Sequence, residues 1–108
     1  MKFPVTLSAV LFMGSIAMPL TASAADSAET LVKSNGCTAC HSTDTKLVGP
    51  SYKDVAAKYK GDKEAEAKLI AKVKAGGSGV WGPVPMPPHP AISDADLKTM
   101  VDWVLALK

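Results

Sequence analysis

Residues 37–41 read CTACH, and this stretch decides the fold of the chain. Two cysteines stand three positions apart and a histidine follows the second one directly, which is the attachment signature of a c-type haem. Each thiol can add to one vinyl group of the porphyrin, and the next residue then places an imidazole nitrogen under the iron. The pattern predicts one covalent haem c, anchored by Cys37 and Cys40, with His41 as an iron ligand.

Three other interpretations of these residues are open. A structural zinc site needs four ligands, and the chain offers Cys37, Cys40, His41 and the distant His89 at an unusual spacing. A thioredoxin-like redox pair needs a βαβ context, which the helical pattern described below does not provide. A plain disulfide is the third interpretation, since exported proteins often contain one. The signature, combined with an export signal, favours haem attachment.

That export signal lies in residues 1–24, which combine a charged start, an apolar run and a small-residue ending, ASA. These are the features of a cleavable signal peptide. A membrane anchor is the alternative, but Pro4, Gly14 and Pro19 interrupt a run shorter than the roughly 18 apolar residues that a spanning helix needs. We expect cleavage after residue 24, which leaves one exported domain, residues 25–108, without stable membrane insertion.

The composition of the chain describes a small domain with little net charge. The formal charge is +2, arginine is absent, and acidic residues alternate with lysines rather than forming separate clusters. A nucleic-acid-binding protein is expected to present a clustered basic face, so no nucleic-acid partner is predicted. A domain this short buries a modest fraction of its surface and often needs a cofactor, metal or disulfide for stability.

The periodicity of the chain predicts an all-α fold with four short helices and no strand. Asp26 with Glu29 is read as the start of the first helix, and Ser93 with Asp96 forms a capping box at the start of the last. We expect helices over residues 27–35, 51–61, 63–75 and from 93 onward. The last helix has a stripe of core-facing positions, which comprises Leu97, Met100, Val101, Val104 and Leu105.

A proline-rich loop supplies the second predicted iron ligand. Five of the eight prolines lie in residues 83–90 with Met86 among them, and such a segment forms neither a helix nor a central strand. After the signal peptide the chain has only one other methionine, Met100, which lies on the helical stripe and is read as core. Met86 as mere loop packing would leave the prolines unexplained, so we predict His41/Met86 ligation. With both axial positions filled, the protein is expected to be a one-electron carrier and no enzyme.

Three stretches resemble the small bacterial class I monohaem cytochromes of the cytochrome c-551/c-552 type. They are GCTACHSTDTKLVGPSYKDVAAKYKG (36–61), GVWGPVPMPP (79–88) and SDADLKTMVDWVLALK (93–108). The resemblance implies the class I cytochrome c fold, with the first and last helices crossing near the haem edge. It also implies an electron carrier in the periplasm, which we expect to be a monomer. Its redox partners would be a nitrite reductase, a cytochrome c peroxidase or a terminal oxidase, with a quinol-oxidising complex or another cytochrome upstream.

The same resemblance assigns roles to further residues. Pro50 matches the position whose carbonyl accepts a hydrogen bond from the proximal imidazole, and Trp81 the tryptophan whose indole reaches a haem propionate. Lys72 falls where a basic side chain assists. Trp81 as core and Lys72 as a solvated lysine are the alternatives. Relatives commonly have asparagine three residues after the ligand methionine. Here His89 stands there, either simply exposed or placed near the Met86 sulfur or a propionate.

Two other functions stay open at this stage. A haem sensor or small-molecule binder would release Met86 readily, and a weak peroxidase would need an open iron site. For an electron carrier we expect weak docking through the haem edge. That surface is predicted to comprise Val48, Pro50, Val80, Val84, Pro85 and Pro87.

Overall fold

The structure, a computed structural model, describes residues 9–10, 13–15 and 24–108. The predicted signal peptide, residues 1–24, therefore lies mostly outside the described residues. Within the described part, no helix has the length and apolar character needed to cross a membrane.

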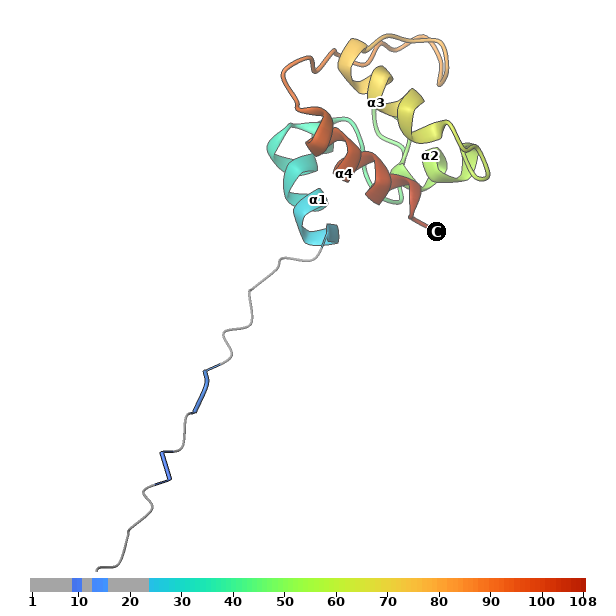
Figure 1. Ribbon diagram of the computed structural model, residues 1–108. Helices are drawn as coiled ribbons and strands as arrows, with labels where there is room; N and C mark the ends of the chain where they lie inside the picture. The colour runs from blue at the N-terminus through green and yellow to red at the C-terminus, as the bar shows by residue number, and fades with distance from the viewer. Residues whose placement is uncertain (1–8, 11–12, 16–23) are drawn as a thin grey trace, which may run out of the picture.

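Short helices joined by long loops make up the domain (Figure 1). No β-strand occurs in residues 24–108, where extended pairing is limited to two isolated bridges. The all-α prediction with four helices is thus confirmed, and a short 3₁₀ helix, η1, is added to them. In chain order the elements are α1 (Ala24–Ser34), η1 (Cys37–Ala39), α2 (Tyr52–Lys58), α3 (Ala65–Ala75) and α4 (Asp94–Leu105).

Helices α2 and α4 begin where their capping residues predict. The Ser51 hydroxyl accepts a hydrogen bond from the Asp54 N–H at 3.1 Å, and the Ser93 hydroxyl accepts one from the Asp96 N–H at 3.2 Å. Each bond satisfies one of the amide groups that lack a partner in the first turn of a helix. The predicted left-handed exit of α1 is also confirmed, because Gly36 has φ 75°.

Other predicted boundaries were wrong by a few residues. Helix α1 begins at Ala24, so Asp26 is not its cap but an acidic residue in its first turn. A negative charge there interacts favourably with the positive end of the helix dipole. Helix α2 ends at Lys58 rather than at residue 61. The backbone N–H groups that follow donate to carbonyls closer in sequence than the four-residue spacing of an α-helix, and so form turns. Helix α3 starts at Ala65 because the Asp62 carboxylate accepts the Glu64 N–H at 2.9 Å and holds a turn before it.

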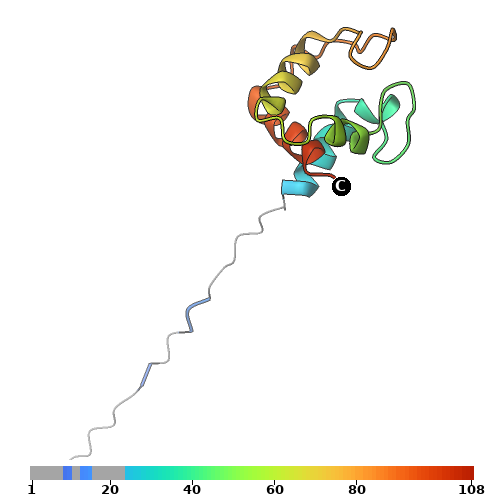
Figure 2. The ribbon, with the colours of Figure 1, turned by 90° about the vertical axis from the view of Figure 1, so that its right-hand side faces the viewer.

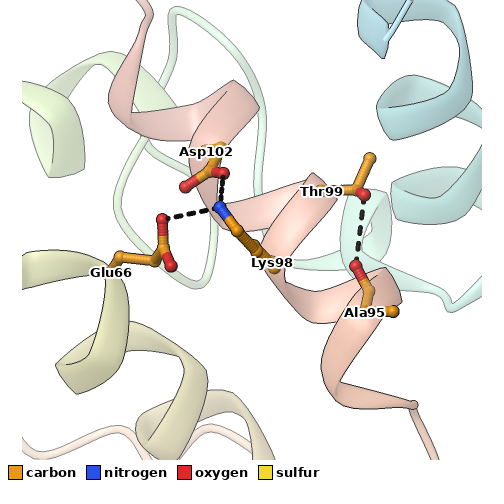
Figure 3. A network of polar contacts seen from close by, with 5 residues as sticks. All are labelled: Glu66, Ala95, Lys98, Thr99 and Asp102. Carbon is orange, nitrogen blue, oxygen red and sulfur yellow. Dashed lines mark hydrogen bonds and ion pairs between the residues drawn. The ribbon is translucent and has the colours of Figure 1, made fainter.

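Helix α4 is the centre of the packing, since α1, α2 and α3 all contact it. Three positions of its predicted stripe, Leu97, Met100 and Val101, are buried, whereas Val104 and Leu105 are half-buried. On the outside of α4, the Lys98 ammonium bonds the carboxylates of Glu66 at 3.2 Å and Asp102 at 2.7 Å, which links α3 to α4 (Figure 3). The contact between α1 and α4 agrees with the crossing that the resemblance implies. The core cluster comprises Val32, Tyr52, Leu97 and Met100.

The helices position two long loops. Residues 35–51 connect α1 to α2, and residues 76–93 connect α3 to α4. Figure 2 shows these loops on the same side of the domain and apart from one another, while the helices form the wall behind them. The space between the loops is lined by side chains of both.

Candidate haem-binding site

A cavity of about 460 Å³ lies between the two loops and the inner faces of the helices. Its wall is largely apolar, with side chains from α1, α2, α3 and α4, among them Val32, Val55, Val73 and Val101. The structure brings every residue of the predicted site to this one cavity. They are Cys37, Cys40, His41, Pro50, Lys72, Trp81 and Met86.

The CTACH segment forms one wall of the cavity because its backbone closes on itself. The amides of Cys40 and His41 both donate to the Cys37 carbonyl, at 3.1 and 2.9 Å. This tight turn keeps the two thiols and the imidazole on one side of the segment. Cys37 and Cys40 are half-buried and carry no disulfide. Burial raises the pKa of the Cys37 thiol, and Cys40 adds to that shift.

The imidazole of His41 has a defined orientation. Its Nδ1 lies 2.7 Å from the Pro50 carbonyl oxygen, which can only accept, so Nδ1 is the donor of this hydrogen bond, and in the neutral imidazole Nε2 is the nitrogen with the free lone pair. Gly49 makes room for the ring, since a Cβ there would lie 2.5 Å from His41 Cε1. Tyr52 stacks on the ring at 5.4 Å between centroids with 24° between the planes. An imidazole held in this way presents Nε2 as a metal ligand.

The second loop brings Met86 to the cavity from a different part of the chain. Met86 pairs with Gly77 through two backbone hydrogen bonds, Met86 N–H to Gly77 O at 2.9 Å and Gly77 N–H to Met86 O at 3.0 Å. Met100 also lines the cavity, but it is only 5% exposed and belongs to the core cluster, as its place on the helical stripe predicted.

Trp81 and Lys72 occupy the part of the cavity wall formed by the end of α3 and the loop after it. Trp81 is 42% exposed, so the alternative of a core tryptophan is wrong. The Lys58 ammonium lies 5.2 Å from the centroid of the Trp81 ring, within the range of a cation–π contact. Lys72 is half-buried rather than fully solvated.

His89 lies apart from these side chains. It is half-buried, its N–H donates to the Val73 carbonyl at 3.0 Å, and it is not among the residues lining the cavity. In residues 24–108 its imidazole makes no hydrogen bond to Met86, so the structure does not place it against the sulfur. Nor do the described residues contain a group of three or more His, Cys, Asp or Glu side chains that could hold a metal ion. The four-residue zinc set is therefore not assembled.

Two residues of the site escaped sequence reasoning, Gly49 and Tyr52. Tyr52 is 7% exposed, packs edge-on against Trp103 at 5.6 Å, and lines the cavity. Its hydroxyl is buried with no hydrogen-bond partner in the described part of the chain, and burial raises its pKa. The helical spacing of Tyr52, Val55 and Ala56 was the available signal, because it marks one buried face of α2.

These features fit a haem c. Two thiols three positions apart, an imidazole with an unprotonated Nε2, and a thioether all line one apolar cavity, and these are the donors used for thioether attachment and axial ligation. An all-α fold built around such a cavity defines the class of small c-type cytochromes.

Comparisons with known proteins agree with this class. Residues 25–108 match the family model described as Cytochrome c. Cytochrome c-551 of Pseudomonas aeruginosa is 55% identical over 84 residues, covering 78% of this chain and 80% of the relative. The crystal structure of wild-type Nitrosomonas europaea cytochrome c552 has a TM-score of 0.71 and 52% identity over 74% of this chain and 99% of that one. Class 1 cytochrome MtoD from Sideroxydans lithotrophicus ES-1 has a TM-score of 0.68 and 40% identity, covering 76% and 94%.

The chain belongs to the cytochrome c family. Within that family it is of the class I monohaem cytochrome c-551/c-552 type, as its sequence motifs predicted. It is an electron carrier and not an enzyme, its cofactor is one covalent haem c, and its partners are redox proteins.

Proposed function

We propose that this protein carries single electrons in the periplasm with a haem c whose iron is held by His41 and Met86. One observation supports this most directly: His41 and Met86, which lie in two separate loops, line the same apolar cavity as Cys37 and Cys40. Haem c supplies an iron that changes between Fe(II) and Fe(III). A thioether ligand and an apolar surrounding both favour the Fe(II) state and raise the reduction potential.

The other side chains of the cavity hold and tune the group. The Pro50 carbonyl accepts a hydrogen bond from the His41 Nδ1–H, which orients the ring and increases the basicity of Nε2. Trp81 and Lys72, both at the cavity, provide an indole N–H and an ammonium for the haem propionates. Their position on the exposed side of the domain suits the charged end of the cofactor, because burying a carboxylate without a partner is costly.

Docking takes place through the apolar rim of the cavity. Val48, Val80 and Val84 line it and are 57, 48 and 58% exposed. Pro85 and Pro87 are exposed beside them. A small, unpaired apolar surface suits the weak and brief contacts of redox partners. We assign as partners a nitrite reductase, a cytochrome c peroxidase or a terminal oxidase, with a quinol-oxidising complex or another cytochrome as donor, and we expect the carrier to be monomeric.

Residues 1–24 direct the chain to this compartment and are removed there. The apolar run and the ASA ending support this assignment. A protein purified from the periplasm is expected to begin at Ala25. Intact mass and N-terminal sequencing check this, and an N-terminus at Met1 contradicts it.

Optical spectra of matched variants test the ligand assignment. The wild type is expected to show a Soret band and, in the ferric state, the red-region absorption of methionine–iron coordination. Met86→Leu is expected to abolish the red band and lower the reduction potential. Met100→Leu is expected to keep the red band and the wild-type potential, because leucine conserves the core volume. A red band that survives in Met86→Leu contradicts the assignment. A wild-type red band that is lost at neutral pH favours instead a sensor that releases its methionine.

A further inference from the structure

We infer that Gly76, the residue that follows α3, positions Met86 for coordination of the iron. The inference rests on the proposed His41/Met86 ligation and names a residue outside the ligand set. Gly76 has φ 66° and ψ −158°. This combination is accessible almost only to glycine, so the exit from α3 depends on the absence of a side chain here.

Gly76 also lies directly against the backbone of residues 86–88, which contain Met86 and are called the ligand segment below. A Cβ at this position would lie 2.5 Å from the Met86 carbonyl oxygen, 2.8 Å from the Pro88 nitrogen and 3.0 Å from the Pro87 carbonyl carbon. All three are main-chain atoms in a proline-stiffened segment, which cannot turn aside as a flexible side chain would. A methyl group at residue 76 must therefore push Met86 away from α3.

Backbone hydrogen bonds hold the ligand segment on α3 from both sides. Gly77 and Met86 exchange two bonds of 2.9 and 3.0 Å, and the His89 N–H donates to the Val73 carbonyl at 3.0 Å. Val73 lies in the last turn of α3, and the Gly76 N–H closes that turn on the Lys72 carbonyl at 2.7 Å. Because α3 packs on α4, the distance of Met86 from the opposite cavity wall is set by a rigid helix. Gly76 allows that helix and the ligand segment to approach so closely.

Displacement of the methionine by imidazole tests this inference on the haem-loaded protein. We compare Gly76→Ala with Gly61→Ala, since Gly61 also has a positive φ, 80°, but open space where its Cβ would be. Overpacking against main chain is expected to let imidazole replace Met86 in Gly76→Ala at an about tenfold lower concentration, seen as loss of the red band. Gly61→Ala is expected to titrate like the wild type. In a Met86→Ala background, where the red band is absent and imidazole binding is followed by the shift of the Soret band, Gly76→Ala is expected to leave imidazole affinity unchanged, because no methionine remains to be displaced.

The outcomes separate this inference from the ligation on which it depends. A wild type without the methionine band overturns the His41/Met86 assignment and the inference with it. A normal wild type with equal titrations of Gly76→Ala and Gly61→Ala overturns the inference alone. So does an effect of Gly76→Ala that persists in the Met86→Ala background, since it would not act through the methionine.

A measurement on the wild type gives a second test if Gly76→Ala fails to mature. Amide hydrogen exchange is followed in the haem-loaded protein with and without imidazole. We expect the Gly77 and Met86 amides to be protected and to keep most of that protection when imidazole displaces the Met86 sulfur, because their hydrogen bonds anchor the backbone to the end of α3 and not to the iron. Loss of the protection of Gly77 and Met86 on displacement would show that the iron bond, and not α3, holds the segment, and would overturn the inference.

Discussion

At the scale of single residues, Gly49 decides how the proximal imidazole sits. Its φ is not positive, so alanine is tolerated by the backbone, but a Cβ would lie 2.5 Å from His41 Cε1 and 2.9 Å from Nδ1. Gly49→Ala is expected to tilt the ring, lengthen the Nδ1–H bond to Pro50 and cost about 1–3 kcal/mol of stability. The reduction potential should rise as the ring loses its hydrogen bond, because a less basic Nε2 stabilises Fe(III) less. Denaturant unfolding and redox titration measure both effects, and a wild-type potential in this variant would contradict the prediction.

Tyr52 makes a second residue-scale prediction, which concerns alkaline stability. Burial raises the pKa of its hydroxyl above the ordinary value of about 10. Above that pH the unfolded chain ionises this group while the folded protein keeps the proton. The folded state then binds more protons than the unfolded state. The free energy of unfolding therefore keeps its full value below about pH 10 and declines above it, by up to about 1.4 kcal/mol per pH unit.

Tyr52→Phe removes this loss and keeps the ring contacts with His41 and Trp103. At neutral pH the variant is expected to equal the wild type or exceed it by about 1 kcal/mol, since it lacks an unpartnered buried hydroxyl. Its advantage should grow between about pH 9 and about pH 11. Denaturant unfolding of both proteins across this range tests the prediction. Stability curves that stay parallel would show that the hydroxyl titrates normally.

At the scale of elements, the loop between α3 and α4 owes its order to prolines. Pro87 and Pro88 follow the ligand and restrict the unfolded loop in advance, which lowers the entropy lost when Met86 meets the iron. Replacing both by alanine is expected to weaken the methionine–iron bond by about 1–2 kcal/mol, from about 0.4–1 per proline. The helices, which do not include these residues, should unfold with a smaller loss. Imidazole displacement and far-UV thermal unfolding compare the two, and equal losses would contradict this account.

At the scale of the whole molecule, the surface charges largely compensate one another. The formal charge is only +2, and lysines pair with nearby carboxylates, for example Lys53 with Asp44 and Lys74 with Asp94. Long-range attraction to a partner is consequently weak and is screened by salt beyond about 10 Å at 0.1 M. We expect the electron-transfer rate to a partner to change only a few-fold with ionic strength. Stopped-flow rates at increasing salt measure this, and a steep fall would point to a charged rather than an apolar docking surface.

Local patterns predicted most of the fold and the groups for haem attachment and ligation, whereas Pro50, Trp81 and Lys72 entered the candidate site through the resemblance. The attachment signature, the capping residues Ser51 and Ser93 and the stripe of α4 depend on neighbours within a few positions, so they are readable in the chain. Helix ends were less predictable. Asp62 and the residues after Lys58 form local turns that compete with helical hydrogen bonds, and residue types alone do not decide which of the two forms.

Tertiary structure alone decided the position of the two loops relative to one another. The resemblance places the Pro50 carbonyl against the imidazole, but nothing in the chain reports that Gly49 and Tyr52 also contact that ring. Nor does anything around Gly76 report the main chain ten residues further on. These contacts join segments brought together by packing on α4, and their distances are set by that packing. By itself, therefore, the sequence determined which groups are available for haem attachment and ligation, because that chemistry depends on residue type and spacing. Where those groups stand was decided by the folded helices, because only they fix the separation of the two loops.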